Sequence, residues 1–383
     1  MNFSVPGDKK THPIAELFPH ESQFLARHLG ELSEKESEWK KYPGGKEFAE
    51  YLGAIKEFYS SKDPAEAEKI QEKIVECYAK VSKTDFPVIL VSGTEGYYKE
   101  PYIDPELRVC ISTNETNNEI KSFEHAKELM ANSLGEIGAE KFADNVKNME
   151  IKSSIALGGF GVNLAFNAVA QEDVFYHLFL NEQIFAYDRY FPKYVGMVEN
   201  SNEAFSDISA EEKKNRIEKM SRMSSMFQVF GHRIYPYNSE AGQRLGRKPL
   251  TTIDEVKAET LWRSLIPQII KDKEFFGTEE QWATATLASL SLTAKDSEVY
   301  SDSAVYNLNA LFSSGAVKFE NEKLVISDVN KYFSIEKECA EKVLGLYRDE
   351  TMTERKASAW IKKECVPTEL VEPFLSFIRS LPD

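Results

Sequence analysis

His232, Glu255 and Glu259 have the residue types and the spacing that chemistry at one site requires. His232 follows a stripe of apolar residues at helical spacing, and Glu255 lies early in the next expected helix. Some zinc peptidases hold their metal in this way, with a histidine at the end of one helix and a glutamate in the next. Glu255 and Glu259 are one turn apart on the same helical face. The three side chains therefore predict a metal site or an acid–base cluster.

The same residues also have a purely structural interpretation. The apolar stripe is typical of a core helix, whose last-turn histidine bonds to a neighbour. It consists of Ile217, Met220, Met223, Phe227 and Phe230. We expect the second helix to open near residue 251, with Thr252 or Asp254 as its N-cap. Acidic residues in a first turn are favoured by the helix dipole, which alone explains Glu255.

Two runs carry a resemblance to the dipeptidyl peptidase III family of zinc exopeptidases. They are residues 227–232 (FQVFGH) and 254–259 (DEVKAE). The family has HExxGH on one helix and E-E-[CA]-[KR]-A-[ED] on the next. Its two histidines and the second glutamate of the later stretch hold zinc, and the glutamate after the first histidine activates water. The resemblance implies that His232 and Glu255 are residual ligands, whereas Phe227 and Gln228 stand at the first-ligand and general-base positions.

Three further stretches are similar to the family, and all the matches together cover roughly residues 86–366 in the family's order. Residues 93–102 (GTEGYYKEPY) resemble a segment of the family's peptide-binding cleft and put Tyr98 at its tyrosine position. Residues 152–159 (KSSIALGG) resemble the strand before the zinc helix. Residues 300–317 resemble a downstream helix, in which Tyr300 replaces a histidine that supports the transition state.

The substituted positions predict that the zinc chemistry is lost. A catalytic zinc takes about three protein ligands, and Phe227 supplies none. Gln228 is neutral at every pH, so it cannot accept a proton from bound water as a carboxylate does. We therefore predict no zinc dipeptidase activity, and we expect neither zinc, another divalent metal nor any other cofactor. We expect Phe227 to fill the metal position against Met220 and Met223, in a helix without the π-bulge that two histidines five residues apart require.

The first functional hypothesis is a peptide-binding pseudopeptidase. Its ligand, a peptide or small molecule, would lie in a cleft between two lobes. An edge strand at residues 152–159 would pair with a peptide backbone. Tyr98, Asn163 and Asn167 are the candidate contacts, although each is also typical of a surface turn or loop.

The alternative hypothesis is an enzyme with altered chemistry in the same cleft. His232, Glu255 and Glu259 would then act as acid–base groups, or would bind a divalent ion harder than zinc. A third option is a vestigial cleft in a scaffold or oligomer subunit. The residues alone leave these alternatives open.

Composition excludes several classes of partner. The chain has 383 residues, with 47 Lys+Arg against 62 Asp+Glu, and its net charge is −15. This acidity, without a basic patch, predicts no binding to nucleic acid. No stretch approaches the ~18 apolar residues of a membrane span, and the N-terminus does not resemble a secretory signal. The four cysteines form no CxxC pair, so we expect buried, reduced thiols in a cytoplasmic protein.

The hydrophobic periodicity predicts an α+β fold with a mixed N-terminal half and a helical C-terminal half, and the resemblance to the dipeptidyl peptidase III family implies that the two halves form two lobes. A mixed lobe of helix and sheet is expected at 1–170, and a mainly helical lobe carrying the degenerate motif at 171–383. From about Asp173 onward the pattern reads as almost entirely helical. Ser209 and Glu212 predict a capping box. Other expected helices are 15–32, 46–59, 64–81 and 123–134, with strands at 86–93, 107–113 and 151–159 and a hairpin at 316–319 and 323–326.

Overall fold

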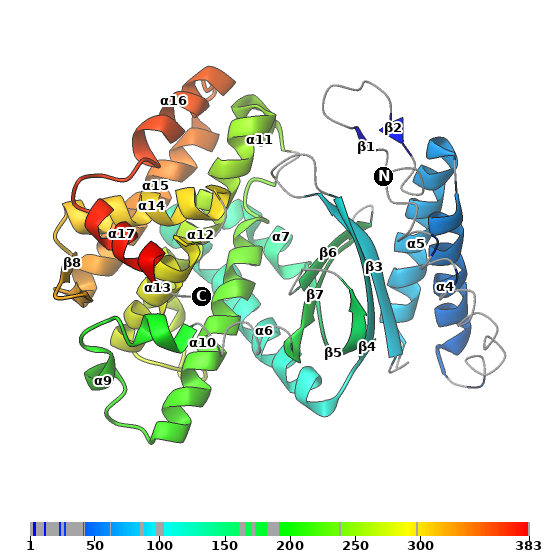
Figure 1. Ribbon diagram of the computed structural model, residues 1–383, viewed down its shortest axis with the longest axis horizontal. Coiled ribbons are helices and arrows are strands. Elements are labelled where there is room, and N and C mark those ends of the chain that lie inside the picture. Colours follow the sequence, from blue (N-terminus) through cyan, green and yellow to red (C-terminus); the bar gives the residue numbers. More distant parts are fainter. Residues whose placement is uncertain are drawn as a thin grey trace. The chain divides into compact units, whose positions relative to one another are not determined.

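The computed structural model divides into two compact units (Figure 1). The first contains residues 1–120 and 149–183, and the second contains residues 121–148 and 184–383. The structure describes residues 3–4, 11–12, 23, 27, 41, 43–61, 63–84, 88–96, 103–160, 165–170, 173–181, 191–236, 239–295 and 298–381. The expected lobes, 1–170 and 171–383, were continuous segments, whereas each unit of the structure is assembled from two separate ones.

A five-stranded sheet forms the centre of the first unit, in the order β3-β4-β5-β7-β6. The strands are β3 (Val88–Gly96), β4 (Ile103–Ile111), β5 (Glu150–Phe160), β6 (Ala165–Ala170) and β7 (Asp173–Phe179). All neighbouring strands are antiparallel except β5 and β7, which run parallel. A register shift between Val109 and Cys110 interrupts the β4–β5 ladder. A separate two-residue ladder joins β1 (Phe3–Ser4) to β2 (Thr11–His12).

Strand β5 changes partner along its length. Residues Glu150–Ser154 pair with β7, whereas residues 155–160 pair with β4. The expectation of an edge strand at 152–159 was wrong for the strand as a whole, because β5 lies between β4 and β7 in the strand order. The later part of β5 nevertheless has a partner on the β4 side only, as far as the described strands extend.

Two helices pack together beside the sheet, α4 (Gly45–Ser60) and α5 (Pro64–Ser82) (Figure 1). A buried chain of hydrogen bonds joins α5 to the sheet through His177 of β7. Tyr78 Oη lies 2.8 Å from His177 Nδ1, and Ser154 Oγ lies 2.6 Å from His177 Nε2. Burial lowers the pKa of His177 to about 3, so this imidazole is neutral near pH 7.

The second unit is mainly helical. Its longer helices are α10 (Ala210–Gly231), α12 (Arg247–Ile269), α13 (Glu279–Thr293), α14 (Glu298–Ser313) and α15 (Val329–Arg348). Shorter helices are α7 (Ala143–Lys147), α9 (Ser201–Ala204), α11 (Glu240–Leu245), α16 (Glu354–Glu364) and α17 (Glu372–Ser380), with two 3-10 turns, η1 (Leu134–Ile137) and η2 (Glu140–Phe142). Helix α6 (Asn114–Ser133) begins in the first unit and ends in the second. The expected hairpin is present as β8 (Val317–Glu320) and β9 (Lys323–Ile326).

Helix α12 is the core helix of the second unit. It contacts α10, α14, α15 and α16, and it is buried on every side along most of its length. Gly231 at the end of α10 allows this helix to lie close to α12, because a Cβ atom there would lie 2.6 Å from the carbonyl oxygen of Ala258. Helix α12 starts at Arg247, so the expectation that Thr252 or Asp254 caps it was wrong.

Several other expectations are settled by the structure. The helices at 46–59, 64–81 and 123–134 are confirmed, as are the strands at 107–113 and 151–159. All four cysteines are free and buried. The helical interpretation from Asp173 onward was wrong at its start, because 173–179 forms β7 between β5 and β6. The helix expected at 15–32 lies outside the described residues, apart from residues 23 and 27.

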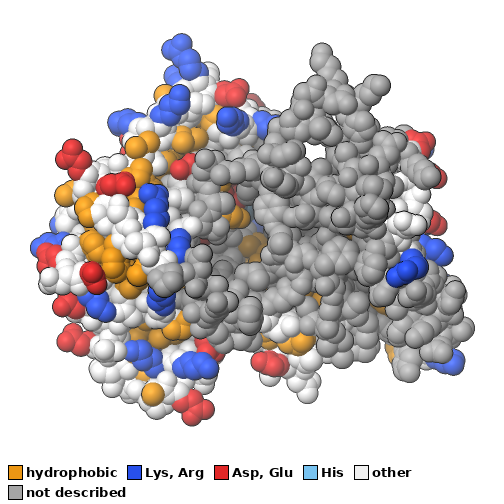
Figure 2. All heavy atoms as spheres, in the orientation of Figure 1, with side chains coloured by type: hydrophobic (Ala, Val, Ile, Leu, Met, Phe, Trp, Pro, Cys, Tyr) orange, Lys and Arg blue, Asp and Glu red, His pale blue; other side chains and the backbone are white. Residues whose placement is uncertain are grey.

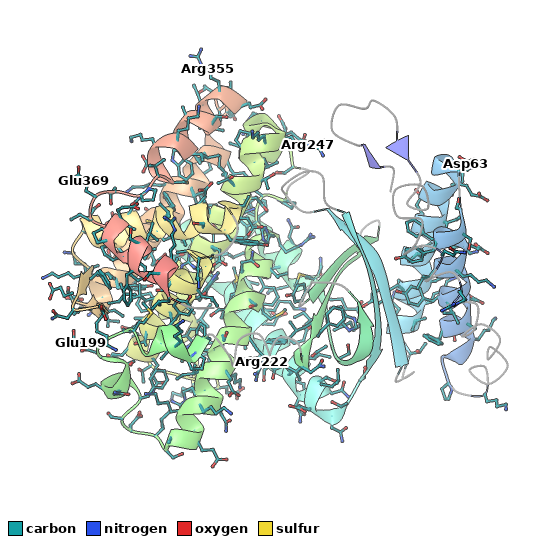
Figure 3. All side chains as sticks on the ribbon, in the orientation of Figure 1. Asp63, Glu199, Arg222, Arg247, Arg355 and Glu369 are labelled. Carbon is teal, nitrogen blue, oxygen red and sulfur yellow. The ribbon has the colours of Figure 1, made fainter. Side chains whose placement is uncertain are left out.

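The surface of the helical unit mixes charges of both signs with apolar side chains (Figure 2). Glu199, Arg222, Arg355 and Glu369 lie around its periphery (Figure 3). Within the described part of the chain, no helix combines the length and the apolar character that a membrane crossing needs.

Candidate functional site

Helix α10 supplies Gln228 and His232. The hydroxyl of Ser209 caps its first turn by accepting a hydrogen bond from the Glu212 N–H at 3.1 Å, which is the Ser209 half of the expected capping box. Helical assignment is continuous from Ala210 to Gly231, without a π-bulge, which agrees with the expectation for a helix that lacks the first histidine. Gln228 and His232 are therefore one regular turn apart on the same face.

Helix α12 supplies Asp254, Glu255 and Lys257. Glu255 is 1% exposed and Lys257 is fully buried. The Lys257 ammonium donates to Asp254 Oδ1 at 2.5 Å and to the Tyr235 carbonyl at 3.2 Å. The Tyr347 hydroxyl lies 3.4 Å from the same carboxylate oxygen. Asp254 is thus held from one side by a cation and faces His232 with its other oxygen.

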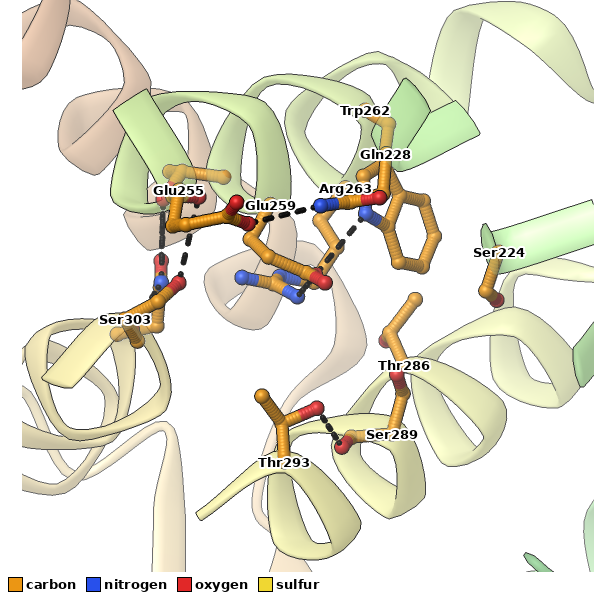
Figure 4. A network of polar contacts seen from close by, with 12 residues as sticks. Ser224, Gln228, Glu255, Glu259, Trp262, Arg263, Thr286, Ser289, Thr293 and Ser303 are labelled. Atoms are coloured by element: carbon orange, nitrogen blue, oxygen red, sulfur yellow. Dashed lines mark hydrogen bonds and ion pairs between the residues drawn. The ribbon is translucent and has the colours of Figure 1, made fainter. Parts of the chain in front are cut away.

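The amide group of Gln228 lies between the two residual ligands of the family motif, and Figure 4 shows its contact with Glu255. Its Nε2 atom is 2.9 Å from His232 Nε2 and donates to Glu255 Oε2 at 2.8 Å. A carboxylate only accepts hydrogen bonds, so the NH₂ end of the amide must face Glu255. The second amide hydrogen then points at His232 Nε2, which must be an acceptor. The imidazole proton is therefore on Nδ1, 2.5 Å from Asp254 Oδ2.

Burial and the neighbouring charges shift the pKa values of His232, Asp254 and Lys257. Burial lowers the pKa of His232, but the carboxylates of Glu255 and Asp254 outweigh burial, and the net direction is upward. Burial alone would raise the pKa of Asp254, but the positive charge of Lys257 and the hydrogen bonds from His232 and Lys257 hold it well below its usual range. Desolvation lowers the pKa of Lys257 despite its contact with Asp254.

Phe227 does not lie between His232 and Glu255, contrary to our expectation. Its ring is fully buried and stacks on Trp262 at a centroid distance of 6.0 Å, within an aromatic cluster that also includes Phe275 and Trp282. On a regular α-helix consecutive side chains point about 100° apart. Phe227 therefore enters the core, and Gln228 instead reaches the two polar residues.

Glu259 belongs to a different polar cluster (Figure 4). Its Oε2 atom accepts from Arg263 at 2.7 Å and from the Trp262 indole N–H at 3.2 Å. Arg263 also approaches Glu336 of α15 at 3.4 Å. The hydrogen bonds therefore join His232 and Glu255 through Gln228, whereas they tie Glu259 to Arg263.

The side chains at this site do not fit a zinc ion. His232 directs Nδ1 at Asp254 and Nε2 at the Gln228 amide, and Gln228 presents a hydrogen-bond donor where a metal would need a lone pair. Within the described residues, no group of three or more His, Cys, Asp or Glu side chains is placed to hold a metal ion.

The remaining predicted residues are placed only in part. Tyr98 and Asn163 lie outside the described residues, and Asn167 lies on β6 opposite Tyr176 of β7. Tyr300 lies in the first turn of α14 and is half-buried.

The sequence analysis missed Asp254 and Lys257 as site residues. Both belong to the 254–259 stretch that resembles the family motif. Their signal was the i, i+3 spacing of an acid and a base on a helix, because such residues are neighbours on its surface.

Comparison with known structures supports a dipeptidyl peptidase III-like fold. The structure of DPP III from Caldithrix abyssi matches with a TM-score of 0.59 and 14% identity, covering 87% of this chain and 68% of that chain. The structure of dipeptidyl-peptidase III from Corallococcus sp. strain EGB matches with a TM-score of 0.60 and 14% identity, covering 93% of this chain and 68% of that chain. No family model matches the chain, and no curated protein matches it either. At this identity the likeness concerns the fold.

Proposed function

We propose that this chain is a peptide-binding protein that does not hydrolyse peptides. The observation that carries the proposal is the partner change along β5. Residues 155–160 pair with β4, and no described strand pairs with their other edge. Such an edge presents backbone N–H and C=O groups that an extended peptide can pair with. The buried, free thiols also fit a reducing compartment, and we propose that the protein is cytoplasmic.

The absence of hydrolysis follows from the residues next to His232. Peptide hydrolysis of the zinc type needs a metal-bound water and a group that accepts its proton. Gln228 cannot accept that proton, and its amide hydrogens already point at Glu255 and His232. We expect turnover of dipeptidyl-naphthylamides to stay at the background level, with or without added zinc.

Binding is tested with backbone-modified peptides. Unmodified tetrapeptides are screened by calorimetry, and the tightest binder is then N-methylated at one residue at a time. Hydrogen bonds between strands recur at every second residue of each strand, so affinity should fall at alternate positions of the peptide. A uniform loss at all positions, or no binding by any tetrapeptide, would contradict the proposal.

The chain offers a matched pair of variants for the same test. Gly158 and Gly159 lie opposite Val109 and Arg108 of β4, and consecutive residues direct their N–H groups to opposite edges. Of Gly158→Pro and Gly159→Pro, one should break the ladder to β4 and lower the melting temperature. The other should keep the melting temperature and weaken peptide binding. Equal affinity for the stable variant and the wild type would argue against this edge.

A further inference from the structure

The polar contacts between α10 and α12 are arranged around a single nitrogen atom. Gln228 Nε2 is 2.9 Å from His232 Nε2 and 2.8 Å from Glu255 Oε2. Neighbouring ligand atoms around a six-coordinate ion with bonds of about 2.1 Å are roughly 3 Å apart. The amide nitrogen therefore lies from the imidazole and the carboxylate at the distance that separates neighbouring ligand atoms of such an ion.

We propose that the Gln228 amide group has taken over the bridging role of a metal ion, so that it joins α10 to α12 and keeps divalent cations out of this site. An NH₂ group supplies two hydrogens to two acceptors, which satisfies both partners without a net charge. It also blocks the approach of a cation, because it has no lone pair to offer. The inference does not depend on peptide binding, which we assign to the sheet of the other unit.

The contacts around the bridge reinforce its orientation. Asp254 fixes the Nδ1 proton of His232 at 2.5 Å, so Nε2 is held as an acceptor toward Gln228. The hydroxyl of Ser303 lies 3.5 Å from the backbone carbonyl of Glu255, and Glu255 is 1% exposed. A buried carboxylate that loses a hydrogen-bond donor is destabilised, so the amide contributes to the stability of this site.

The sharpest test changes the donor into a ligand. Gln228→Glu keeps the shape of the side chain and places a carboxylate oxygen beside Glu255 and His232. Two carboxylates this close repel each other unless a proton or a cation lies between them. We expect this variant to bind one equivalent of Zn²⁺ or Mn²⁺ in calorimetry, at least ~100-fold more tightly than the wild type, because it gains a third protein ligand. Adding His232→Ala should abolish the gain.

Two further variants guard against a folding defect. Gln228→His adds no charge and places two histidines one turn apart, which is a common metal-binding spacing on a helix. It should also gain Zn²⁺ binding. Gln268→Glu is the matched control, since it adds the same charge to α12 where Gln268 accepts from Lys271. It should bind metal no better than the wild type.

The wild type itself provides the deciding measurement. We expect no metal in the purified protein by elemental analysis and no change in melting temperature with EDTA. Gln228→Leu, which removes the bridge but keeps the bulk, should lower the melting temperature. One equivalent of tightly bound metal in the wild type that His232→Ala removes would overturn the proposal. So would an unchanged melting temperature in Gln228→Leu, or metal binding by Gln228→Glu no tighter than by Gln268→Glu.

Discussion

Lys257 has a buried ammonium group whose counter-ion is the carboxylate of Asp254. Its ammonium is fully buried and bonds to Asp254 and to the carbonyl of Tyr235, a residue with a positive φ of 50°. Its Nζ atom also lies 5.1 Å from the ring centre of Tyr347. A charge taken out of water must be compensated by its partners, so removing a single partner costs far more than removing the pair. Asp254 therefore serves both Lys257 and His232.

Asp254→Asn should destabilise the helical unit by about 3 kcal/mol at pH 7, because Lys257 then loses its counter-ion. Adding Lys257→Met should recover most of this loss, since the uncompensated charge is gone. Urea unfolding of the two single variants and the double variant measures the coupling. Asp207→Asn, at an exposed position, is the control and should change stability by less than about 0.5 kcal/mol. Simple addition of the two single costs would refute the coupling.

Glu336 is a second buried group with unbalanced charge. Its carboxylate lies 3.4 Å from Arg263 Nε, but Arg263 is already paired with Glu259 at 2.7 Å. Within the described residues, Arg263 Nη2 and Glu336 Oε1 have no hydrogen-bond partner. Burial raises the pKa of Glu336 to about 7, and the attraction of Arg263 offsets this only in part. The folded protein therefore holds a proton here that the unfolded chain releases.

The pH dependence of stability follows from that proton. The carboxyl pKa is about 7 in the folded state against 4.5 for the unperturbed group, so the protonated form stabilises the fold. This contribution is complete below pH 4.5 and is lost as the pH rises to 7. Between pH 5 and 8 the wild type should lose about 2–3 kcal/mol more than Glu336→Gln. Glu338→Gln, exposed on the same helix, should follow the wild type. Parallel curves for Glu336→Gln and the wild type would rule this out.

At the scale of elements, the packing of α10 on α12 positions the polar cluster. Gly231 lies against the backbone of Ala258, where an added Cβ would be 2.6 Å from the carbonyl oxygen and 2.7 Å from Cα. Both contacts are with backbone, so no side chain can move aside. The close approach brings Gln228 and His232 of one helix within hydrogen-bonding distance of Asp254 and Glu255 of the other.

Gly231→Ala should therefore destabilise the protein by about 2–3 kcal/mol, because the two helices must separate. Gly345 is the matched control on α15, since its added Cβ would meet nothing within 4 Å. Gly345→Ala should stabilise by about 0.5–1 kcal/mol through helix propensity and the reduced freedom of the unfolded chain. Thermal unfolding of both variants gives the comparison. A neutral Gly231→Ala would mean that the helices are less tightly joined than their contact suggests.

The sequence predicted the elements of this site better than the contacts within it. Apolar periodicity predicted the buried stripe of α10, because it depends only on the 3.6-residue repeat. It could not show that Gln228 would bridge His232 and Glu255, since that depends on the distance between two helices. Strand β7 was missed because a strand paired on both sides reads as a continuous apolar run, which periodicity cannot distinguish from a helix.

At the scale of the whole molecule, the helical unit depends on a segment far away in sequence. Residues 121–148 belong to this unit although the sheet strands of 149–183 follow them. Arg348 donates to the carbonyls of Ile137 and Gly138 at 2.7 and 2.8 Å, and Asn145 donates to the carbonyl of Arg233 at 3.2 Å. Phe142 packs on Tyr235 at 4.4 Å. A domain boundary predicted from local residue patterns cannot show that residues 121–148 join the later unit, because local patterns carry no information about distant contacts.

Residues 184–383 expressed alone should therefore lack fixed tertiary packing, because residues 121–148 supply buried side chains such as Phe123, Met130 and Leu134. Near-ultraviolet circular dichroism should be weak while the helical far-ultraviolet signal remains. A synthetic peptide of residues 121–148 should restore the near-ultraviolet signal and a cooperative thermal transition, whereas a scrambled peptide should not. In the full chain, Arg348→Ala should lower the melting temperature, because two carbonyl groups lose their donor. If residues 184–383 alone unfold with a sharp transition at the temperature of the full chain, residues 121–148 are not part of the core of this unit.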